Sequence, residues 1–224
     1  MSRTTLARLC AALGIGSVVL LGIHSMILGA RPAADAAARD VANYLHSHAT
    51  AVLASAWLDG IGSIGVITVI YVLVHLTGHA TGLWGRATCL VATTIIGLSL
   101  VIDAALIAAV HAAGQGGSET AATLWSLAAG LDFVFPVANA VWMSLLGMLL
   151  FRSSVLPRAY APLVVLVGVV EITIGTAALF SPAFEPANNL VFIGFVAWML
   201  AASIGLAVGA GRLASEPEPS FATT

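Results

Sequence analysis

The chain has 224 residues, of which 60% are hydrophobic and only 8% are charged, and its formal net charge is −2. A soluble domain carries roughly 25% charged residues, so a chain this apolar must have lipid as its main solvent. The small net charge argues against a nucleic-acid partner, which needs a basic patch, and two cysteines are too few for a disulfide framework.

Six segments are long and apolar enough to cross a bilayer, which needs about 20 mostly apolar residues. In chain order these segments are 6–30, 51–77, 87–112, 121–151, 159–180 and 188–211. Only a helix satisfies its own backbone hydrogen bonds in lipid, and the alternating pattern of a membrane β-barrel is not visible. The sequence therefore predicts an all-α, polytopic membrane protein in which residues 1–212 form one domain, a six-transmembrane-helix bundle.

The first segment has a second interpretation. The stretch "MSRTTLARLCAALGIGSVVLLG", followed by "ARPAADA", resembles a secretory signal with a small-residue cleavage site. We favour retention as a transmembrane helix, because the apolar run is longer than a usual signal core and His24 interrupts its end. Cleavage would leave five spans without moving the others.

The connections between the segments are short. The longest, 31–48, places Val41, Leu45 and His48 on one side and Arg39 and Asn43 on the other, which is typical of a short helix at the membrane interface. We predict a flexible turn at 114–119, a stiff turn at 181–186 and a disordered cytoplasmic tail at 213–224.

The arginines indicate how the chain is oriented. Two of them, Arg31 and Arg39, fall on one side of the predicted membrane. Six fall on the side of the N-terminus: Arg3, Arg8, Arg86, Arg152, Arg158 and Arg212. Positive residues concentrate in cytoplasmic loops, so we expect both termini in the cytoplasm.

Four segments each carry one acidic residue in their interior: Asp59, Asp103, Asp132 and Glu171. Counted from the predicted outer helix ends, all four lie roughly 12–17 Å below the outer surface. Because an ionisable group facing lipid costs about 2.5–3.5 kcal/mol, we expect the four acids to face the bundle interior in one layer, with Asn139 on the same helix face as Asp132.

No lysine occurs in the chain and the arginines lie near helix ends, so the acids lack cationic partners in the sequence. We expect most of them to be protonated when the site is empty, and to exchange the proton for a small cationic ligand. A second interpretation stays open, in which each acid is a hydrogen-bonded connection between helices. Pro136 favours the cavity, because a proline frees a backbone carbonyl one turn earlier, at Asp132 itself, although a simple kink is the alternative.

Four histidines lie toward the outer side. His24 and His111 are candidates for carrying protons between water and the acids. His46 and His48, with Asp35, Asp40 and His111, are weak candidates for a metal site, because imidazole binds zinc, copper and nickel. The sequence requires no cofactor, and a haem held by His24 and His111 is a further alternative without any other haem signature.

Enzyme motifs are mostly absent. The chain has no H-E-x-x-H and no G-x-S-x-G, and without lysine it forms no Schiff base. The sequence "GIGS" occurs twice, starting at Gly14 and Gly60, and we interpret it as helix-packing glycine. These absences make an enzyme the less favoured reading.

The stretch "GMLLFRSSVLPRAYAPLVVLVGVVE", 147–171, carries a family resemblance. Its R-S-x-x-x-P-R turn, together with acids in the second and fourth spans and "AWML" in the sixth, resembles a bacterial family of six-span membrane proteins known only as domain of unknown function 4386. The resemblance implies the fold and a multi-pass location in the bacterial inner (plasma) membrane, and implies no activity. The lack of lysine and the histidine-rich outer side depart from the family pattern.

Three functions follow as hypotheses. The first is a proton-linked transporter or binding protein for a small cationic ligand, with its site at Asp59, Asp103, Asp132, Asn139 and Glu171. The second is a non-catalytic partner or assembly subunit of a larger membrane complex, as a homo- or hetero-oligomer. The third is a membrane enzyme acting on a lipid-soluble substrate.

Overall fold

The computed structural model describes residues 2–29, 31–181 and 185–212, and these residues form helices without any strand. The helices are α1 (Arg3–Ile27), α2 (Ala38–Ser47), α3 (Ala49–Leu76), α4 (Leu83–Gly114), α5 (Ser118–Phe151), α6 (Tyr160–Phe180) and α7 (Glu185–Gly209). All except α2 are long and apolar enough to cross a membrane. The predicted six-helix fold is confirmed, and no span boundary differs from its predicted position by more than four residues.

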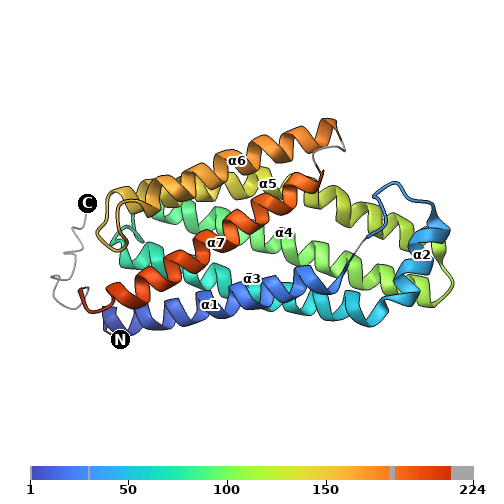
Figure 1. The fold of residues 1–224 in the computed structure, drawn as a ribbon, viewed down its shortest axis with the longest axis horizontal. Helices are drawn as coiled ribbons and strands as arrows, with labels where there is room; N and C mark the ends of the chain where they lie inside the picture. The colour runs from blue at the N-terminus through green and yellow to red at the C-terminus, as the bar shows by residue number, and fades with distance from the viewer. Residues whose placement is uncertain (1, 30, 182–184, 213–224) are drawn as a thin grey trace.

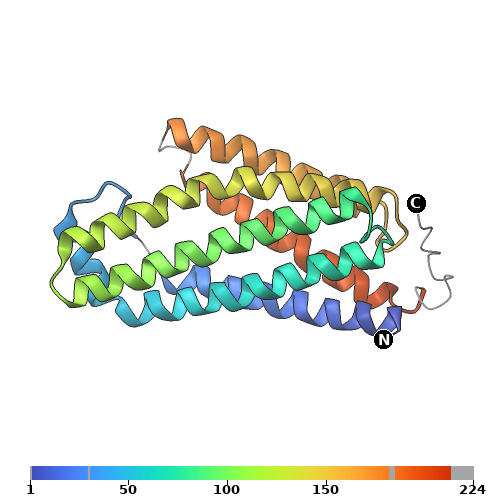
Figure 2. The same ribbon diagram turned by 180° about the vertical axis from the view of Figure 1, so that it is seen from behind.

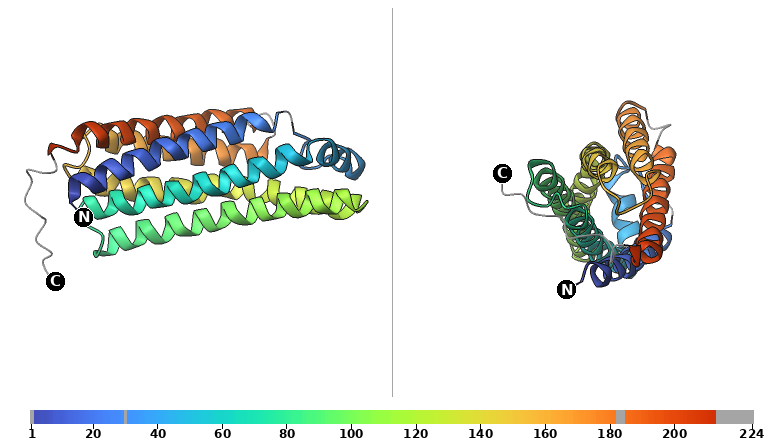
Figure 3. Two further views of the ribbon diagram at one scale, coloured as in Figure 1. Left: turned by 90° about the horizontal axis from the view of Figure 1, so that it is seen from below. Right: turned by 90° about the vertical axis from the view of Figure 1, so that its left-hand side faces the viewer.

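The six long helices are arranged as a closed ring. Going round the ring, each packs against two neighbours in the order α1, α3, α4, α5, α6, α7 and back to α1 (Figure 3). α1 begins and α7 ends at the same end of the bundle, which we call the N-terminal end, while α2 lies at the opposite end, the α2 end (Figure 1). The two ends of the chain's helical part are therefore on one side of the bundle.

The helices differ in length, and the difference matters for the site. α4 and α5 have 32 and 34 residues, roughly 50 Å at 1.5 Å per residue, whereas the hydrocarbon core of a bilayer is about 30 Å thick. α6 has only 21 residues. α4 and α5 therefore extend beyond α6 at the α2 end, as the view from behind shows (Figure 2).

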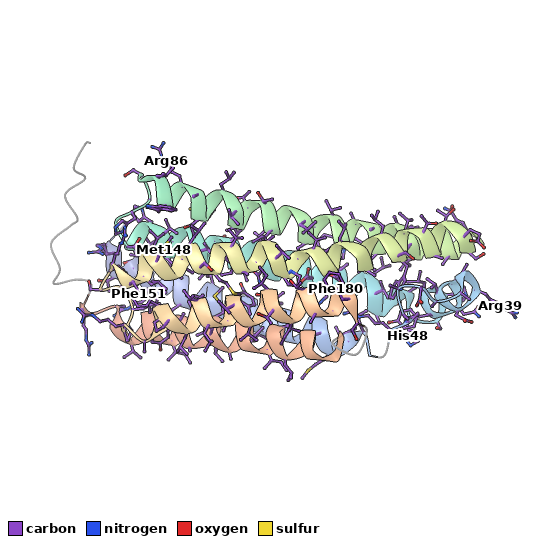
Figure 4. All side chains as sticks on the ribbon, turned by 90° about the horizontal axis from the view of Figure 1, so that it is seen from above. Arg39, His48, Arg86, Met148, Phe151 and Phe180 are labelled. Atoms are coloured by element: carbon purple, nitrogen blue, oxygen red, sulfur yellow. The ribbon has the colours of Figure 1, made fainter. Side chains whose placement is uncertain are left out.

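α2 confirms the helix predicted within residues 31–48, but its surroundings differ from the expectation. Val41 and Leu45 are buried in a cluster with residues of α4 and α5, so the apolar face meets protein where membrane contact was expected. His48, predicted to share that face, is exposed and stacks on Tyr44 with 4.5 Å between ring centroids. Arg39 is exposed as predicted, and Figure 4 shows Arg39 and His48 together at this end.

The structure shows a turn at the position predicted between the third and fourth spans, but differs at the predicted stiff turn before the last span. The turn between α4 and α5 contains Gly116 with φ of 80°, a conformation that favours glycine. α7 begins at Glu185, inside the stretch predicted as a stiff turn, of which residues 182–184 lie outside the described residues. The predicted tail, 213–224, also lies outside them.

Apolar side chains fill the ring toward its N-terminal end. One buried cluster draws residues from all six long helices, among them Cys10, Leu73, Ala92, Met143, Val164 and Leu206. The buried polar side chains near this end include Thr88 and Ser203, whose hydroxyls bond to carbonyl oxygens of their own helices. The interior aspartates, Asp59, Asp103 and Asp132, are found farther toward the α2 end.

Close helix packing depends on glycine at several points. A Cβ atom added to Gly168 of α6 would lie 3.1 Å from Cβ of Met143 and 3.3 Å from the carbonyl oxygen of Ala140, both on α5. A Cβ atom added to Gly175 would lie 2.6 Å from Cβ of Pro136. Gly168 and Gly175 therefore lie on the surface with which α6 approaches α5.

The glycines of the two "GIGS" motifs have a similar role. Gly14 faces Ser203 of α7, and a Cβ atom added to Gly62 would lie 3.0 Å from the side chain of Leu21 on α1. The interpretation as helix-packing glycines is confirmed for Gly14 and Gly62, whereas nothing lies within 4 Å of a Cβ atom added to Gly16.

Replacing Gly168 with Ala should lower the free energy of unfolding by about 1–3 kcal/mol, because the new methyl group meets the backbone of α5, which moves only with the whole helix. Gly130→Ala on α5 is the matched control, since nothing lies within 4 Å of an added Cβ there. It should be neutral or stabilise by up to about 1 kcal/mol. Unfolding by titration with sodium dodecyl sulfate measures both, and equal effects would contradict the close approach.

Candidate functional site

The polar residues inside the ring fall into two separate groups. The first contains Asp59, Asp103 and Asp132, which we call the aspartate cluster. The second contains Asn139, Trp142 and Glu171, which we call the Glu171 network. The electrostatic partners of Asp103 and Asp132 include other members of the aspartate cluster, whereas the partner of Glu171 is Asn139.

Serines connect the aspartate cluster between α3 and α4. The Ser99 hydroxyl donates a hydrogen bond of 2.7 Å to Oδ2 of Asp59, and the hydroxyl oxygens of Ser63 and Ser99 lie 3.3 Å apart. Both serines are one helical turn from an aspartate, as the i, i+4 spacing predicts. Asp59 is half-buried, and Asp103 is only 5% exposed.

Asp103 has an unsatisfied oxygen. Its Oδ2 atom is buried, and no donor among the described residues hydrogen-bonds to it. The neighbouring polar group is the carboxyl of Asp59, and a carboxylate is an acceptor only, so it donates a hydrogen bond only when it is protonated. Because an unpartnered buried oxygen costs about 1–3 kcal/mol, the pair is complete only when a proton or a cation lies between the two carboxyls.

Asp132 is exposed, and its position on α5 makes this exposure informative. Ala128 and Pro136, one turn before and after it, are buried, as are Trp125 and Asn139 two turns away. Asp132 therefore faces accessible space on the side of α5 that otherwise packs against neighbouring helices. Asp132 faces the interior of the ring as expected, but unlike Asp103 and Glu171 its side chain is accessible there.

Two basic residues accompany Asp132. Its carboxyl group interacts electrostatically with Arg31, which follows α1, with His24 of α1, and with Asp59. The electrostatic effect of Arg31 on the Asp132 carboxyl was not predicted from the sequence. Arg31 also interacts with Tyr44, where burial raises the pKa of the phenol and Arg31 opposes that rise. Arg31 thus acts electrostatically on both α2 and the aspartate cluster.

The two histidines predicted to carry protons have different surroundings. Nδ1 of His24 lies 2.7 Å from the Ser55 hydroxyl and 3.0 Å from the Ser55 carbonyl oxygen, which ties α1 to α3. Ser55 is one turn from Asp59, so His24 stands beside the aspartate cluster. His111 is exposed, and its Nδ1 lies 2.8 Å from the carbonyl oxygen of Ile107 in its own helix.

The Glu171 network is a closed set of hydrogen bonds between α5 and α6. Nδ2 of Asn139 donates to Oε1 and Oε2 of Glu171 at 2.7 and 2.8 Å, and Nε1 of Trp142 donates to Oδ1 of Asn139. All three residues are buried. Sequence analysis did not single out Trp142, although its position three residues after Asn139 places the two on one helix face.

The two groups lie at different depths. Gly175 packs against Pro136, and Glu171 bonds to Asn139, so these pairs mark common levels on α5 and α6. Asp132 lies seven residues from Asn139 toward the α2 end, roughly 10 Å at 1.5 Å per residue. The predicted single layer is therefore wrong for Asp132 and Glu171.

The outer histidines do not assemble a metal site. Among the described residues, no three His, Cys, Asp or Glu side chains gather in a metal-binding arrangement. Nδ1 of His48 lies 2.9 Å from the Ser47 hydroxyl and 3.1 Å from the carbonyl oxygen of Tyr44, and His46 is exposed. These contacts describe a histidine at the end of a surface helix.

No family model matches the sequence, and no curated protein and no solved structure is significantly similar to the chain. The resemblance to the six-span family therefore stays a prediction. Function has to be argued from the site.

Proposed function

We propose that this protein binds a small cation, either an alkali metal ion or a primary ammonium group, at the aspartate cluster in exchange for a proton. The observation that carries the proposal is the buried, unpartnered Oδ2 of Asp103 beside the carboxyl of Asp59. A proton completes this pair when the site is empty, and a cation completes it when the site is occupied. Such an exchange is the chemical step on which proton-linked transport is built.

The surroundings support this exchange. The exposed Asp132 supplies a route from water, and the apolar filling of the ring toward its N-terminal end directs that route to the α2 end. Arg31 neutralises part of the negative charge while the site is empty. By the arginine distribution, we further propose that the α2 end faces the outside of the cell membrane and both termini face the cytoplasm.

Titration of the purified protein in mild detergent tests the proposal. The probes are Na⁺ and ethylammonium, with ionic strength held constant by N-methylglucamine, in a weakly buffered solution that contains a pH indicator. One of the two probes should bind and release about one proton per protein, because the ligand carboxyl must deprotonate before it binds a cation. Heat and proton release are recorded together.

Two variants sharpen the test. Asp59→Asn should abolish the proton release, since Asp59 is half of the pair, whereas Asp40→Asn changes an exposed carboxyl on α2 and should leave it intact. If neither probe releases protons from the wild type, or if Asp59→Asn behaves as wild type, the aspartate cluster is not a proton-coupled cation site. A stable larger complex in the same detergent would instead favour the partner-subunit hypothesis.

A further inference from the structure

A groove on the outer surface of the ring lies between α3 and α4, near the N-terminal end. Its volume is about 530 Å³, and its lining includes Tyr71 and His75 of α3 and Arg86, Leu90 and Thr93 of α4. The groove lies at the end of the bundle opposite α2, because Arg86 projects from the end opposite Arg39 and His48 (Figure 4). The groove shares no residue with the aspartate cluster, so a ligand bound in it is independent of the proposed cation site.

The basic groups of the groove have no partner within the described protein. Arg86 and His75 are both exposed, and neither side chain hydrogen-bonds or pairs with a described residue. No aspartate or glutamate lines the groove. Its charge is therefore positive and uncompensated, which favours an anionic ligand.

The hydroxyl groups deeper in the groove are already engaged with each other. Thr93 donates to the carbonyl oxygen of Cys89 at 2.8 Å, so its oxygen is left to accept from the Tyr71 hydroxyl at 2.9 Å. This chain of hydrogen bonds fixes the Tyr71 ring as one wall of the groove. The donors that remain for a ligand are the guanidinium of Arg86 and the imidazole of His75, both near the bundle end.

Apolar surface lies beside these donors on the lipid-facing side. Leu90 is 68% exposed and Leu83 is 75% exposed, and Trp84 is exposed next to them. Tryptophan at such a position is typical of the boundary between headgroups and acyl chains. Along α4, Thr93 is seven residues beyond Arg86, roughly 10 Å. The groove therefore offers donors at the membrane surface and an apolar wall that continues into the bilayer.

We propose that this groove binds the headgroup of an anionic phospholipid from the leaflet at the N-terminal end. The Arg86 guanidinium takes the phosphate in a bidentate arrangement, His75 adds an N–H donor, and an acyl chain lies along Leu90. Basic pockets between transmembrane helices on the cytoplasmic side bind such headgroups. The same leaflet is the cytoplasmic one if the arginine distribution sets the orientation as expected.

Native mass spectrometry of the purified full-length protein tests this proposal. Phosphatidylglycerol is added in one sample and phosphatidylcholine with the same acyl chains in another, and glycerol 3-phosphate in a third separates a lipid from a soluble phosphate. The wild type should retain phosphatidylglycerol over phosphatidylcholine. The double variant Arg86→Gln/His75→Gln should lose about tenfold in phosphatidylglycerol affinity and keep its phosphatidylcholine binding.

Arg158→Gln is the matched control, because Arg158 is an exposed arginine at the same end that does not line the groove. It should retain phosphatidylglycerol as the wild type does. Three results would overturn the proposal: an unchanged preference in the double variant, an equal loss in Arg158→Gln, or binding of glycerol 3-phosphate as tight as that of the lipid. The last result would identify the occupant as a soluble phosphate.

Discussion

Replacing Asn139 with Leu is expected to lower the free energy of unfolding by about 2–4 kcal/mol. Leu has the same branched shape and the same number of side-chain heavy atoms as Asn but removes both donor and acceptor, so the carboxyl of Glu171 and the Nε1–H of Trp142 lose their partners. Each unpartnered buried group costs about 1–3 kcal/mol. Glu171 is 6% exposed and Trp142 is 2% exposed, so water does not replace the lost bonds.

Two opposing effects set this magnitude. A hydrogen bond between membrane helices contributes only about 0.6 kcal/mol on average, because the unfolded chain in lipid also finds partners. The Asn139 amide, however, makes two bonds to one carboxyl group and accepts a third from Trp142. Loss of three bonds at one site therefore places the expected cost above the average for a single pair.

A double variant separates lost partners from lost packing. Asn139→Leu/Glu171→Leu removes both sides of the interhelical bond, and replacing both partners with apolar groups is far less costly than stranding one of them. The double variant should recover most of the loss, less about 1 kcal/mol for the unpartnered Trp142 N–H. Unfolding in sodium dodecyl sulfate measures the full cycle.

Ser144→Ala is the matched control for this cycle. The Ser144 hydroxyl bonds to the carbonyl oxygen of Ala140 in its own helix, so its loss removes a polar group of α5 without affecting α6. It should change stability by less than about 1 kcal/mol. An Asn139→Leu effect no larger than this, or a double variant as unstable as the single one, would show that the Glu171 network does not hold α5 to α6.

The six transmembrane helices could be predicted because lipid leaves few choices. A run of about 20 apolar residues has to be a helix, and the arrangement of charges in the loops then marks the ends of each run. The depth of the acids could not be predicted in the same way. The count began at the helix ends, and the ends of α4 and α5 lie beyond the end of α6.

The extension of α4 and α5 beyond α6 is not visible in the sequence, because their projecting ends are also apolar. Val110 and Ala121, near the α2 end, are buried in the cluster that contains Val41 and Leu45 of α2. They are apolar because they pack against another helix, and hydropathy does not distinguish that environment from lipid. Because α2 covers the projecting ends of α4 and α5, these ends look like membrane-embedded helix in the sequence. The depth of Asp132 was therefore counted from a point beyond the end of α6.

The hydrogen-bond and electrostatic partners of the acids could not be predicted from the sequence either. Asp103 and Glu171 give the same signal, an acid within an apolar helix, yet Glu171 has an amide partner and one oxygen of Asp103 has none among the described residues. The proximity of Arg31 to Asp132 depends on the path of a loop. Spacing placed each residue on a helix face, but only the packing of the ring determined which faces met.

Asp103→Asn should have the opposite effect from Asn139→Leu, and raise the free energy of unfolding at neutral pH by about 1–2 kcal/mol. The Asn amide supplies a permanent N–H donor beside the Asp59 carboxyl, whereas the wild type depends on an exchangeable proton to satisfy a buried oxygen that has no other donor among the described residues. An unpartnered buried oxygen costs about 1–3 kcal/mol, so its replacement by a donor recovers part of that cost. The same change should abolish proton release on addition of Na⁺ or ethylammonium, because the amide neither carries nor releases the exchanged proton.

The stability difference between Asp103→Asn and the wild type should also depend on pH. In the wild type, a proton that completes the carboxyl pair is bound by the folded protein and is lost as pH rises, so stability falls with increasing pH. The variant has no such proton, and its advantage over the wild type should therefore increase as pH rises. A variant that gains stability but loses proton exchange is expected when the replaced residue serves binding, since unsatisfied groups persist at functional sites. If Asp103→Asn instead destabilises the protein as Asn139→Leu does, Asp103 is a structural connection between α3 and α4, and the cation site is lost with it.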